Sequence, residues 1–185
     1  MADSHGIRFG IWIEPEMVCT NSWLYEKHPD WILRETARPV RVGRGGSQTV
    51  LDLANPAVRE NILAQLDALR KATPGLAYWK WDANCSFLNL GSPFLDAAHQ
   101  ANFPFDYTKG VYDLLARLRA LDSDIDIQAC ASGGGHADYG FLQYSDELWG
   151  SDYTDARDRI FIQWGEQMFY PAQAVAAHVT VSPNL

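Results

Sequence analysis

The chain has 185 residues, of which 47% are hydrophobic and 21% charged, and its formal net charge is −8. This length predicts a single domain whose core is large enough to fold without disulfides, and the 12% of aromatic residues excludes a disordered chain. No run reaches the ~18 to 20 apolar residues of a membrane span, and the acidic balance argues against nucleic acid or an anionic membrane as the main partner.

Short apolar runs, each bounded by turn residues, predict five main strands. They cover residues 7–13, 76–81, 125–130, 148–150 and 176–181. Runs of this length that stop at Gly, Pro, Asp or Ser are typical of buried strands.

Helical patterns lie between these strands. The first helix begins at Pro56, because Asn55 before it is a suitable cap. The second carries apolar residues three and four apart over 111–121, and the third covers 157–169. One face of the first helix is expected to be apolar, through Val58, Ile62, Leu66 and Leu69.

Strands that alternate with helices and are almost continuously apolar predict an α/β fold with a parallel sheet covered on its faces. A further strand is expected at 48–53. Five main strands are too few for an eight-stranded (β/α)8 barrel, which takes about 250 residues, so the sheet is either open or a barrel cut at both ends. The first strand begins almost at Met1 and the last ends close to Leu185, so we expect residues 1–185 to be a fragment of a single domain.

The cysteines form an odd and sparse set, Cys19, Cys85 and Cys130, without the CxxC spacing of a zinc site. The N-terminal segment MADSHG lacks the basic and then apolar pattern of a secretory signal. We therefore expect reduced thiols in a cytoplasmic protein.

Polar residues follow the predicted strands where each one ends. In a parallel α/β sheet, functional groups gather at these ends. The residues concerned are Glu14, Glu16, Lys80, Asp82, Cys130, Gly133, Gly134, Gly135, Asp152 and His178.

Asp82 is the strongest candidate for chemistry among them. Lys80 lies two residues earlier, so in a strand it projects to the same side as Asp82, where a cation would keep the carboxylate ionised as a nucleophile requires. Asn84 adds an amide on the following turn. The alternative for Asp82 is a turn or a helix cap, which also holds for Asp152, while Asp155 is placed to cap the helix at 157–169.

The glycine run at 133–135 is not a phosphate loop, because neither GxxxxGK[ST] nor GxGxxG is present. We expect it to let the backbone approach a ligand closely.

Six stretches together resemble a known family. They are FGIWIEPEMV (9–18), VLDLANPAVR (50–59), YWKWDAN (78–84), QACASGGG (128–135), WGSDYTDA (149–156) and AHVTVSPN (177–184). In this order and spacing they are similar to the catalytic barrel of glycoside hydrolase family 36, the microbial retaining α-galactosidases or melibiases. The resemblance implies a partial (β/α)8 TIM barrel covering about its third to seventh strands, so that residues 1–185 are a fragment of a single catalytic domain.

The resemblance also implies roles for individual residues. The aspartate of KWDxN, Asp82, is the family's nucleophile, and the first aspartate of SDxTD, Asp152, is its general acid/base. Substrate-binding positions are implied for Lys80, Asn84, Cys130, Gly133, Gly134, Trp12 and Glu14, the last two within the FGxWxEPEM motif.

The implied reaction removes terminal α-galactosyl groups through a covalent galactosyl-enzyme, with no metal or organic cofactor. The implied substrates are small α-galactosides of the melibiose or raffinose type, and the full-length form is expected to be a homo-oligomer. The chemistry agrees, because retaining hydrolysis uses two carboxyls about 5 to 5.5 Å apart, one ionised to attack and one that holds a proton for the leaving oxygen. Asp155 is the nearest competitor of Asp152, and the resemblance decides between them.

Some positions depart from the family pattern. His136 and Cys85 stand where the family often has arginine, and Gly46 aligns with a further arginine that the nearby Arg44 is placed to replace. Pocket acids that the family carries on an earlier strand are also missing. We therefore expect the 185-residue chain alone to be weakly active or inactive.

Three other functions remain open. An α-N-acetylgalactosaminidase on the same scaffold differs only in what contacts the 2-position of the sugar, and a non-catalytic sugar-binding remnant would use the aromatic residues for binding. A metal-dependent barrel enzyme would use carboxylates and one imidazole as ligands, from Glu14, Glu16, Asp82, Asp152 and His178.

Overall fold

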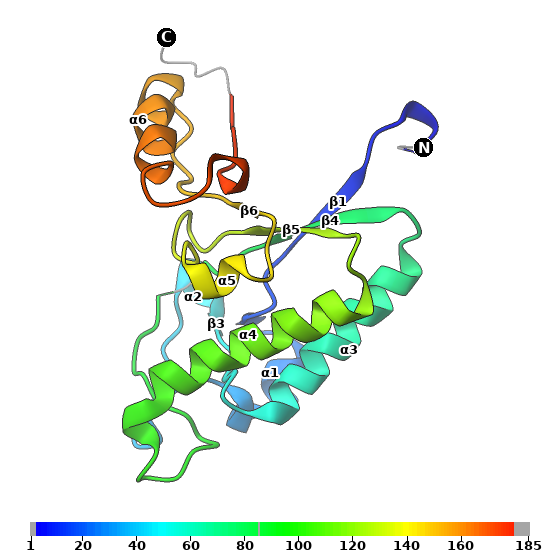
Figure 1. The fold of residues 1–185 in the computed structure, drawn as a ribbon. Coiled ribbons are helices and arrows are strands. Elements are labelled where there is room, and N and C mark those ends of the chain that lie inside the picture. The colour runs from blue at the N-terminus through cyan, green and yellow to red at the C-terminus, as the bar shows by residue number, and fades with distance from the viewer. Residues whose placement is uncertain (1–2, 85, 180–185) are drawn as a thin grey trace. The chain divides into compact units, whose positions relative to one another are not determined.

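The structure is a computed structural model, and it describes residues 3–84 and 86–179. The chain divides into two compact units (Figure 1). The first unit comprises Met1–Ile13, Gly75–Asp82 and Asp124–Leu185, and the second comprises Glu14–Pro74 and Ala83–Ser123. No helix within the described ranges is long and apolar enough to cross a membrane.

The first unit is built on a four-stranded parallel sheet. Its order is β1-β4-β5-β6, with β1 at Phe9–Ile13, β4 at Leu76–Trp81, β5 at Asp126–Ala129 and β6 at Glu147–Leu148. All three neighbouring pairs run parallel. The predicted α/β class with a parallel sheet is therefore confirmed, and the strand predicted at 76–81 has the predicted bounds.

Strand β4 lies inside the sheet and sets its register. Trp79 and Trp81 are at most 1% exposed, so burial of two indoles fixes one face of the strand. Trp81 pairs with Ile13 of β1 and with Ala129 of β5, and Ala129 pairs with Leu148 of β6. Since these pairs stand at the carboxyl end of each strand, the residues that follow leave the sheet along one edge.

The helices of the first unit are short and capped. Helix α5 is Tyr139–Leu142, and α6 is Ala156–Glu166, against a prediction of 157–169. Asp155 caps α6 by accepting from the backbone N–H groups of Arg157 and Asp158, as predicted. The 3-10 turns are η1 (Asp3–His5) and η4 (Ala172–Ala174).

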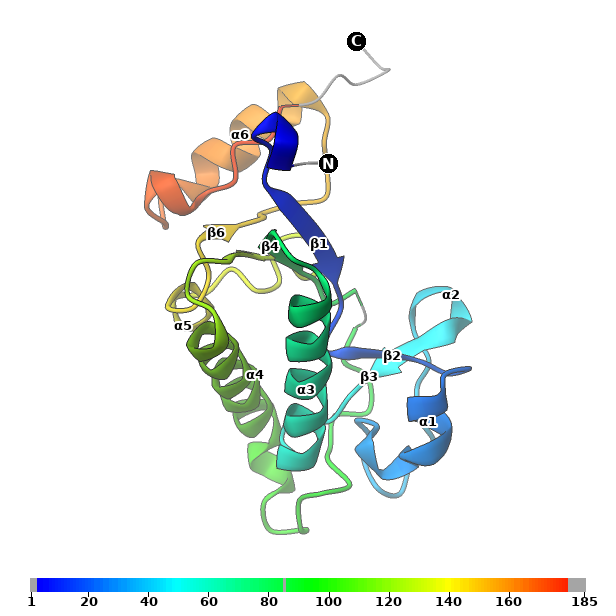
Figure 2. The same ribbon diagram turned by 90° about the vertical axis from the view of Figure 1, so that its right-hand side faces the viewer.

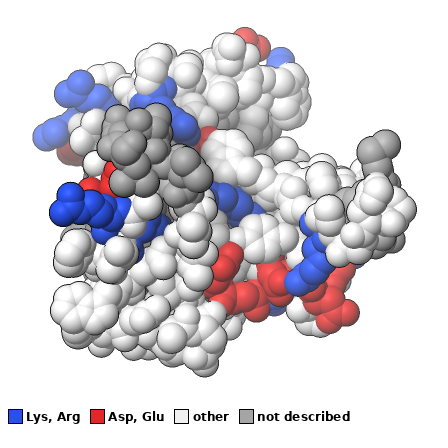
Figure 3. All heavy atoms as spheres, turned by 90° about the horizontal axis from the view of Figure 1, so that it is seen from above, with Lys and Arg blue, Asp and Glu red and all other residues white. Residues whose placement is uncertain are grey.

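Helix α6 exposes several large apolar side chains. Ile160, Phe161 and Trp164 are each at least 60% exposed. The surface seen from above is mostly uncharged, with basic and acidic side chains intermixed (Figure 3). Arg157 and Asp158 of α6 are exposed as well, so the apolar side chains share the surface of this helix with charged ones.

The strand predicted at 176–181 is wrong in its described part. Residues 176–179 form no strand, and pairing with β6 is limited to a single parallel bridge between Leu148 and Val175 and a backbone bond from Ala176 to Leu148. Residues 180 and 181 lie outside the described residues. The apolar run at 176–181 predicts a strand that pairs with its neighbour in the sheet. The neighbour, β6, is only two residues long, so few backbone hydrogen bonds are available for such pairing.

The second unit contains a small antiparallel pair, β2 (Met17–Cys19) with β3 (Gln48–Val50). The prediction of a strand at 48–53 is right at its start, but the strand is shorter and belongs to a separate two-stranded sheet. The connection holds α1 (Trp23–Lys27), η2 (Pro29–Trp31) and α2 (Arg44–Ser47).

Two long helices, α3 (Pro56–Ala72) and α4 (Phe103–Leu121), lie side by side in the second unit (Figures 1 and 2). Helix α3 begins as predicted, with Asn55 as its cap. Helix α4 follows η3 (Gln100–Asn102) and starts eight residues before the predicted segment, with Pro104 in its first turn.

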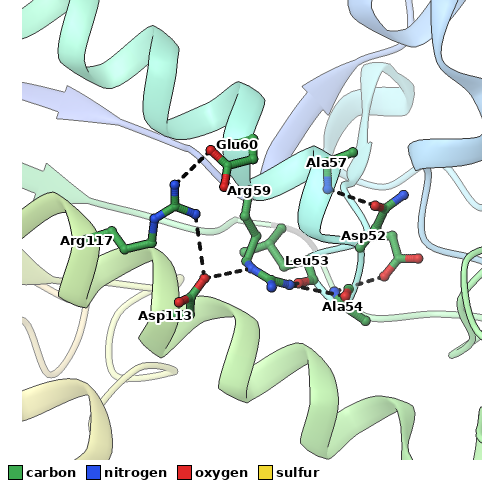
Figure 4. Close-up of polar contacts among 9 residues, drawn as sticks. Asp52, Leu53, Ala54, Ala57, Arg59, Glu60, Asp113 and Arg117 are labelled. Carbon is green, nitrogen blue, oxygen red and sulfur yellow. Dashed lines mark hydrogen bonds and ion pairs between the residues drawn. The ribbon is translucent and has the colours of Figure 1, made fainter.

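Ion pairs fix α3 against α4 (Figure 4). Arg59 of α3 contacts Asp113 of α4 at 2.9 Å and donates to the carbonyl of Leu53 at 2.7 Å. Arg117 of α4 reaches Glu60 of α3 at 2.8 Å. A Cβ at Gly110 would lie 2.1 Å from the Leu53 carbonyl oxygen, so this close contact requires glycine.

Candidate active site

The carboxyl edge of the four-stranded sheet brings together most of the predicted site residues. Backbone bonds continue one residue past each strand, from Asp82 N to Ile13 O at 2.9 Å and from Cys130 N to Trp81 O at 2.8 Å. Trp149 continues β6 in the same way, bonding to Ala129 at 2.8 Å. The first unit therefore gathers seven of the predicted residues at this edge: Trp12, Lys80, Asp82, Cys130, Gly133, Gly134 and Asp152.

Asp82 is a buried carboxylate with neutral hydrogen-bond donors. The residue is 5% exposed. Its Oδ2 accepts from the indole Nε1 of Trp12 at 2.9 Å, and its Oδ1 accepts from the backbone N–H of Ser132 at 3.4 Å. Donors of this kind stabilise the ionised form of a carboxylate without neutralising it.

Cys130 lies beside Asp82 as a neutral thiol. The pKa of the Cys130 thiol is raised to about 12, chiefly by burial and also by the hydrogen bond to the Asp82 carboxylate, while a backbone hydrogen bond with Gly133 and the charge of Lys80 act in the opposite direction. At neutral pH the sulfur therefore keeps its proton and acts as a donor, not as a nucleophile.

The glycine run after β5 packs against the segment after β6. Gly133 has φ +90°, and a Cβ there would lie 2.9 Å from the Cα of Ser151. A Cβ at Gly134 would lie 2.8 Å from the carbonyl oxygen of Gly150. These glycines thus allow a close approach of the chain's own backbone next to Asp152, and the expected approach to a ligand stays a prediction.

Asp152 differs from Asp82 in being exposed. Its Oδ1 accepts from the indole Nε1 of Trp149 at 2.9 Å. Each candidate carboxylate therefore has one tryptophan donor. Asp155 is engaged differently, because its carboxylate caps α6, and this separates it from Asp152 on structural grounds.

Two cations lie over the indole of Trp149, which is 9% exposed. Lys80 Nζ is 4.1 Å from the ring centroid, and the guanidinium carbon of Arg159 is 4.7 Å from it. Arg159 is missed by the sequence reasoning, because an arginine in an amphipathic helix is normally exposed and nothing in its spacing marks it as buried.

The two remaining site residues, Glu14 and Asn84, meet within the second unit. Asn84 Nδ2 donates to Glu14 Oε1 at 2.6 Å, and Arg44 Nη1 reaches the same oxygen at 3.1 Å. Gln48 Nε2 donates to Oε2 at 3.0 Å. The Glu14 side chain is 7% exposed, so both of its oxygens are buried and bonded to neighbouring side chains. Gln48 is a further residue that the sequence reasoning misses.

The ligand set considered for a metal is also engaged elsewhere. Glu16 is fully buried and accepts from the Tyr107 hydroxyl at 2.7 Å, and His178 packs edge-on against Trp149. Within residues 3–84 and 86–179, no group of three or more His, Cys, Asp or Glu side chains is placed to hold a metal ion. The departure at Cys85 and the end of the AHVTVSPN stretch lie outside the described residues.

The curated proteins that this chain resembles include several named as alpha-galactosidases. Alpha-galactosidase 2 of Pediococcus pentosaceus is 40% identical over 183 residues, which is 99% of this chain and 25% of the relative. Alpha-galactosidase AgaA of Geobacillus stearothermophilus is 38% identical over 97% of the chain and 24% of the relative. The chain thus spans about a quarter of the length of the curated relatives that it matches.

Solved structures agree with these relatives. The crystal structure of the GH36 alpha-galactosidase AgaA superimposes with a TM-score of 0.91 at 36% identity, over 98% of this chain and 25% of that one. Variants of AgaA have been solved in complex with raffinose and with stachyose. The family model for melibiase matches residues 1–185. The resemblance to glycoside hydrolase family 36 is therefore confirmed, and the chain belongs to the melibiase family.

Proposed function

We propose that the chain carries the catalytic carboxylates of a retaining α-galactosidase, with Asp82 as the nucleophile and Asp152 as the general acid/base. The observation that carries the proposal is the contrast between the two groups. Asp82 is buried and bonded by neutral donors, which keep a carboxylate ionised for attack, whereas Asp152 is exposed, in the segment after β6 that Gly133 approaches. The relatives named alpha-galactosidase support the same reaction.

In the first step, the Asp82 oxygen attacks the anomeric carbon and the bond to the leaving oxygen breaks, while Asp152 gives its proton to that oxygen. In the second step, water attacks the same carbon, Asp152 takes the proton of the water, and the bond to Asp82 breaks. The Trp12 indole bond orients Asp82 for attack, and the Trp149 indole bond does the same for Asp152.

We further propose that the substrates are small α-galactosides. The raffinose and stachyose complexes of the AgaA variants support this substrate class. Lys80 and Asn84 would bind sugar hydroxyls, and Cys130 with Gly133 and Gly134 would form the wall of the sugar pocket. Trp12 serves through Asp82, and Glu14 through Asn84, because those are the groups that they contact.

The parallel sheet would be part of a (β/α)8 barrel, about its third to seventh strands, within one catalytic domain. The coverage of about a quarter of each relative supports this. The 185-residue chain by itself is then expected to hydrolyse p-nitrophenyl α-galactoside far more slowly than full-length relatives. A rate typical of those enzymes would contradict the expectation.

Covalent labelling tests the nucleophile. A fluorinated galactosyl reagent forms a covalent adduct that breaks down slowly and so accumulates, which means that labelling does not require fast turnover. Mass spectrometry should find the adduct on Asp82, unchanged by EDTA, absent in Asp82→Asn and retained in the exposed-carboxylate control Asp96→Asn. A full-length form that stays unlabelled, or an adduct on a residue other than Asp82, would overturn the proposal.

A further inference from the structure

Arg159 of α6 is a buried cation with an unusual set of contacts. The residue is 2% exposed. Its Nη1 donates to the backbone carbonyl of Ser151 at 2.8 Å and its Nε to Gln163 Oε1 at 3.2 Å. Its Nη2 is buried and has no hydrogen-bond partner among the described residues.

Burying a guanidinium is costly unless its charge and its donors are satisfied. The Glu166 carboxyl lies within reach of the Arg159 charge, but Nη2 is left without a hydrogen bond, so Arg159 is only partly satisfied and its burial is not explained by stability alone. Two of its contacts lie next to Asp152. Arg159 donates to the backbone carbonyl of Ser151, the residue directly before Asp152, and its guanidinium carbon lies 4.7 Å from the centroid of the Trp149 ring. A planar guanidinium can stack on an indole and donate in its own plane at the same time, which a lysine cannot do.

Both contacts converge on Asp152. This side chain is exposed, so packing does not fix its rotamer. Its carboxylate is oriented by the indole Nε1 of Trp149 at 2.9 Å, and its backbone by the Ser151 peptide. Arg159 contacts both of these groups, although it is seven residues away and on a different element.

We propose that Arg159 is a positioning residue that holds the Asp152 carboxylate in one orientation through Trp149 and the Ser151 peptide. The consequence for catalysis rests on the proposed function of Asp152 as the general acid. The hold of Arg159 on Asp152 does not depend on that function, and the two are tested separately.

The indole N–H resonance of Trp149 reports the hold directly. It is identified by its loss in Trp149→Phe, and Asp152→Ala gives its position without the carboxylate acceptor. In Arg159→Met the resonance should move toward the Asp152→Ala position. The control Arg157→Met removes an equal charge from the exposed side of the same helix and should leave the resonance unmoved.

Arg159→Lys serves as a second variant should Arg159→Met fail to fold, because it keeps the charge and loses the combined stacking and donation. If a folded Arg159→Met or Arg159→Lys, judged by circular dichroism, keeps the wild-type resonance, the proposal is overturned.

Leaving-group dependence then tests the catalytic consequence. A sugar alcohol needs a proton to leave, whereas p-nitrophenolate leaves without one. In the full-length form, Arg159→Met should therefore lower kcat/KM for melibiose by ~10-fold or more and kcat/KM for p-nitrophenyl α-galactoside by less than ~3-fold, because kcat/KM ends at the covalent intermediate, before Asp152 acts as base. A shifted resonance without this difference would keep the positioning role and overturn the acid role of Asp152.

Discussion

The indole Nε1 of Trp12 donates to the Asp82 carboxylate at 2.9 Å, and the two residues lie 70 positions apart in the chain. The contact exists because β1 and β4 are parallel and pair Trp12 with Lys80, which places Asp82 just beyond the strand end. Trp12, which is half exposed, thus donates a hydrogen bond to the buried Asp82, which is 5% exposed.

Trp12→Phe removes this donor and leaves a buried carboxylate oxygen without it. The free energy of unfolding should fall by about 1–3 kcal/mol, the range for a lost bond to a charged group. The rate of labelling by the galactosyl reagent should fall as well. Trp164→Phe, at a tryptophan that is 60% exposed, is the control and should change stability by less than about 0.5 kcal/mol.

Glu14→Gln keeps the shape of the side chain but removes its charge and brings an amide N–H₂ toward groups that already donate. The free energy of unfolding should fall by about 1–3 kcal/mol, because three donors converge on this carboxylate. Given the proposed sugar-binding role of Asn84, KM of the full-length form for melibiose should rise more than kcat falls. Glu26→Gln, on the exposed side of α1, should change neither.

Gly133→Ala places a methyl group 2.9 Å from the Cα of Ser151 at a φ of +90°. Both effects are unfavourable, so the midpoint of urea unfolding should fall and labelling of Asp82 should slow. Gly165→Ala makes the same chemical change where a Cβ meets nothing within 4 Å, inside α6. It should stabilise the chain by about 0.5–1 kcal/mol. A similar loss from both variants would contradict this interpretation.

The pH dependence of stability should carry the signature of Glu166. Burial raises the pKa of this carboxyl, and the charge of Arg159 opposes the rise. The folded state therefore binds the proton more tightly than the unfolded state, so the stabilisation is present below the unfolded pKa of 4.5 and is lost as pH rises through the higher folded pKa. Glu166→Gln should remove this loss, so the free energy of unfolding at pH 7, relative to that at pH 4, should be higher in the variant than in the wild type.

Cysteine reactivity should distinguish the two described thiols. Cys19 is exposed and Cys130 is buried. With a pKa of about 12, Cys130 holds only ~10⁻⁴ of its population as thiolate at pH 8. Peptide mapping after iodoacetamide should find Cys19 modified and Cys130 unmodified until the chain is unfolded. Rapid modification of Cys130 in the folded chain would show that its environment is more open.

Local signals made part of the fold predictable. Strand β4 was predictable because an apolar run stands between a Pro-Gly turn and Asp82, and α3 because Asn55 and Pro56 mark its start. The early start of α4 was missed because Phe103 and Tyr107 precede the regular apolar spacing, although Pro104 signals a first turn. Pairing partners were not predictable for β3, which joins β2 in its own sheet.

Part of the candidate site could likewise be predicted from local sequence signals, and part could not. Asp82 and Asp152 could be predicted as candidates because they follow apolar runs within specific motifs. The contacts of Glu14 were not, because its partners stand 30, 34 and 70 positions away and only the folded chain brings them together. Arg159 was missed since its burial comes from the Ser151 peptide and the Trp149 ring, neither of which its own helix pattern reveals.

Because of the register of β4, the number of residues in this strand matters as much as their identity. Lys80 and Asp82 alternate with the buried Trp79 and Trp81, so deleting one residue within 76–81 would exchange the two faces. The aspartate would then stand where an indole is now enclosed, although the KWD motif itself could survive intact. A substitution in this strand changes one side chain, whereas an insertion or deletion reverses the orientation of all those that follow, so a homologue with such a gap would keep the sequence motif while moving Asp82 off the carboxyl edge.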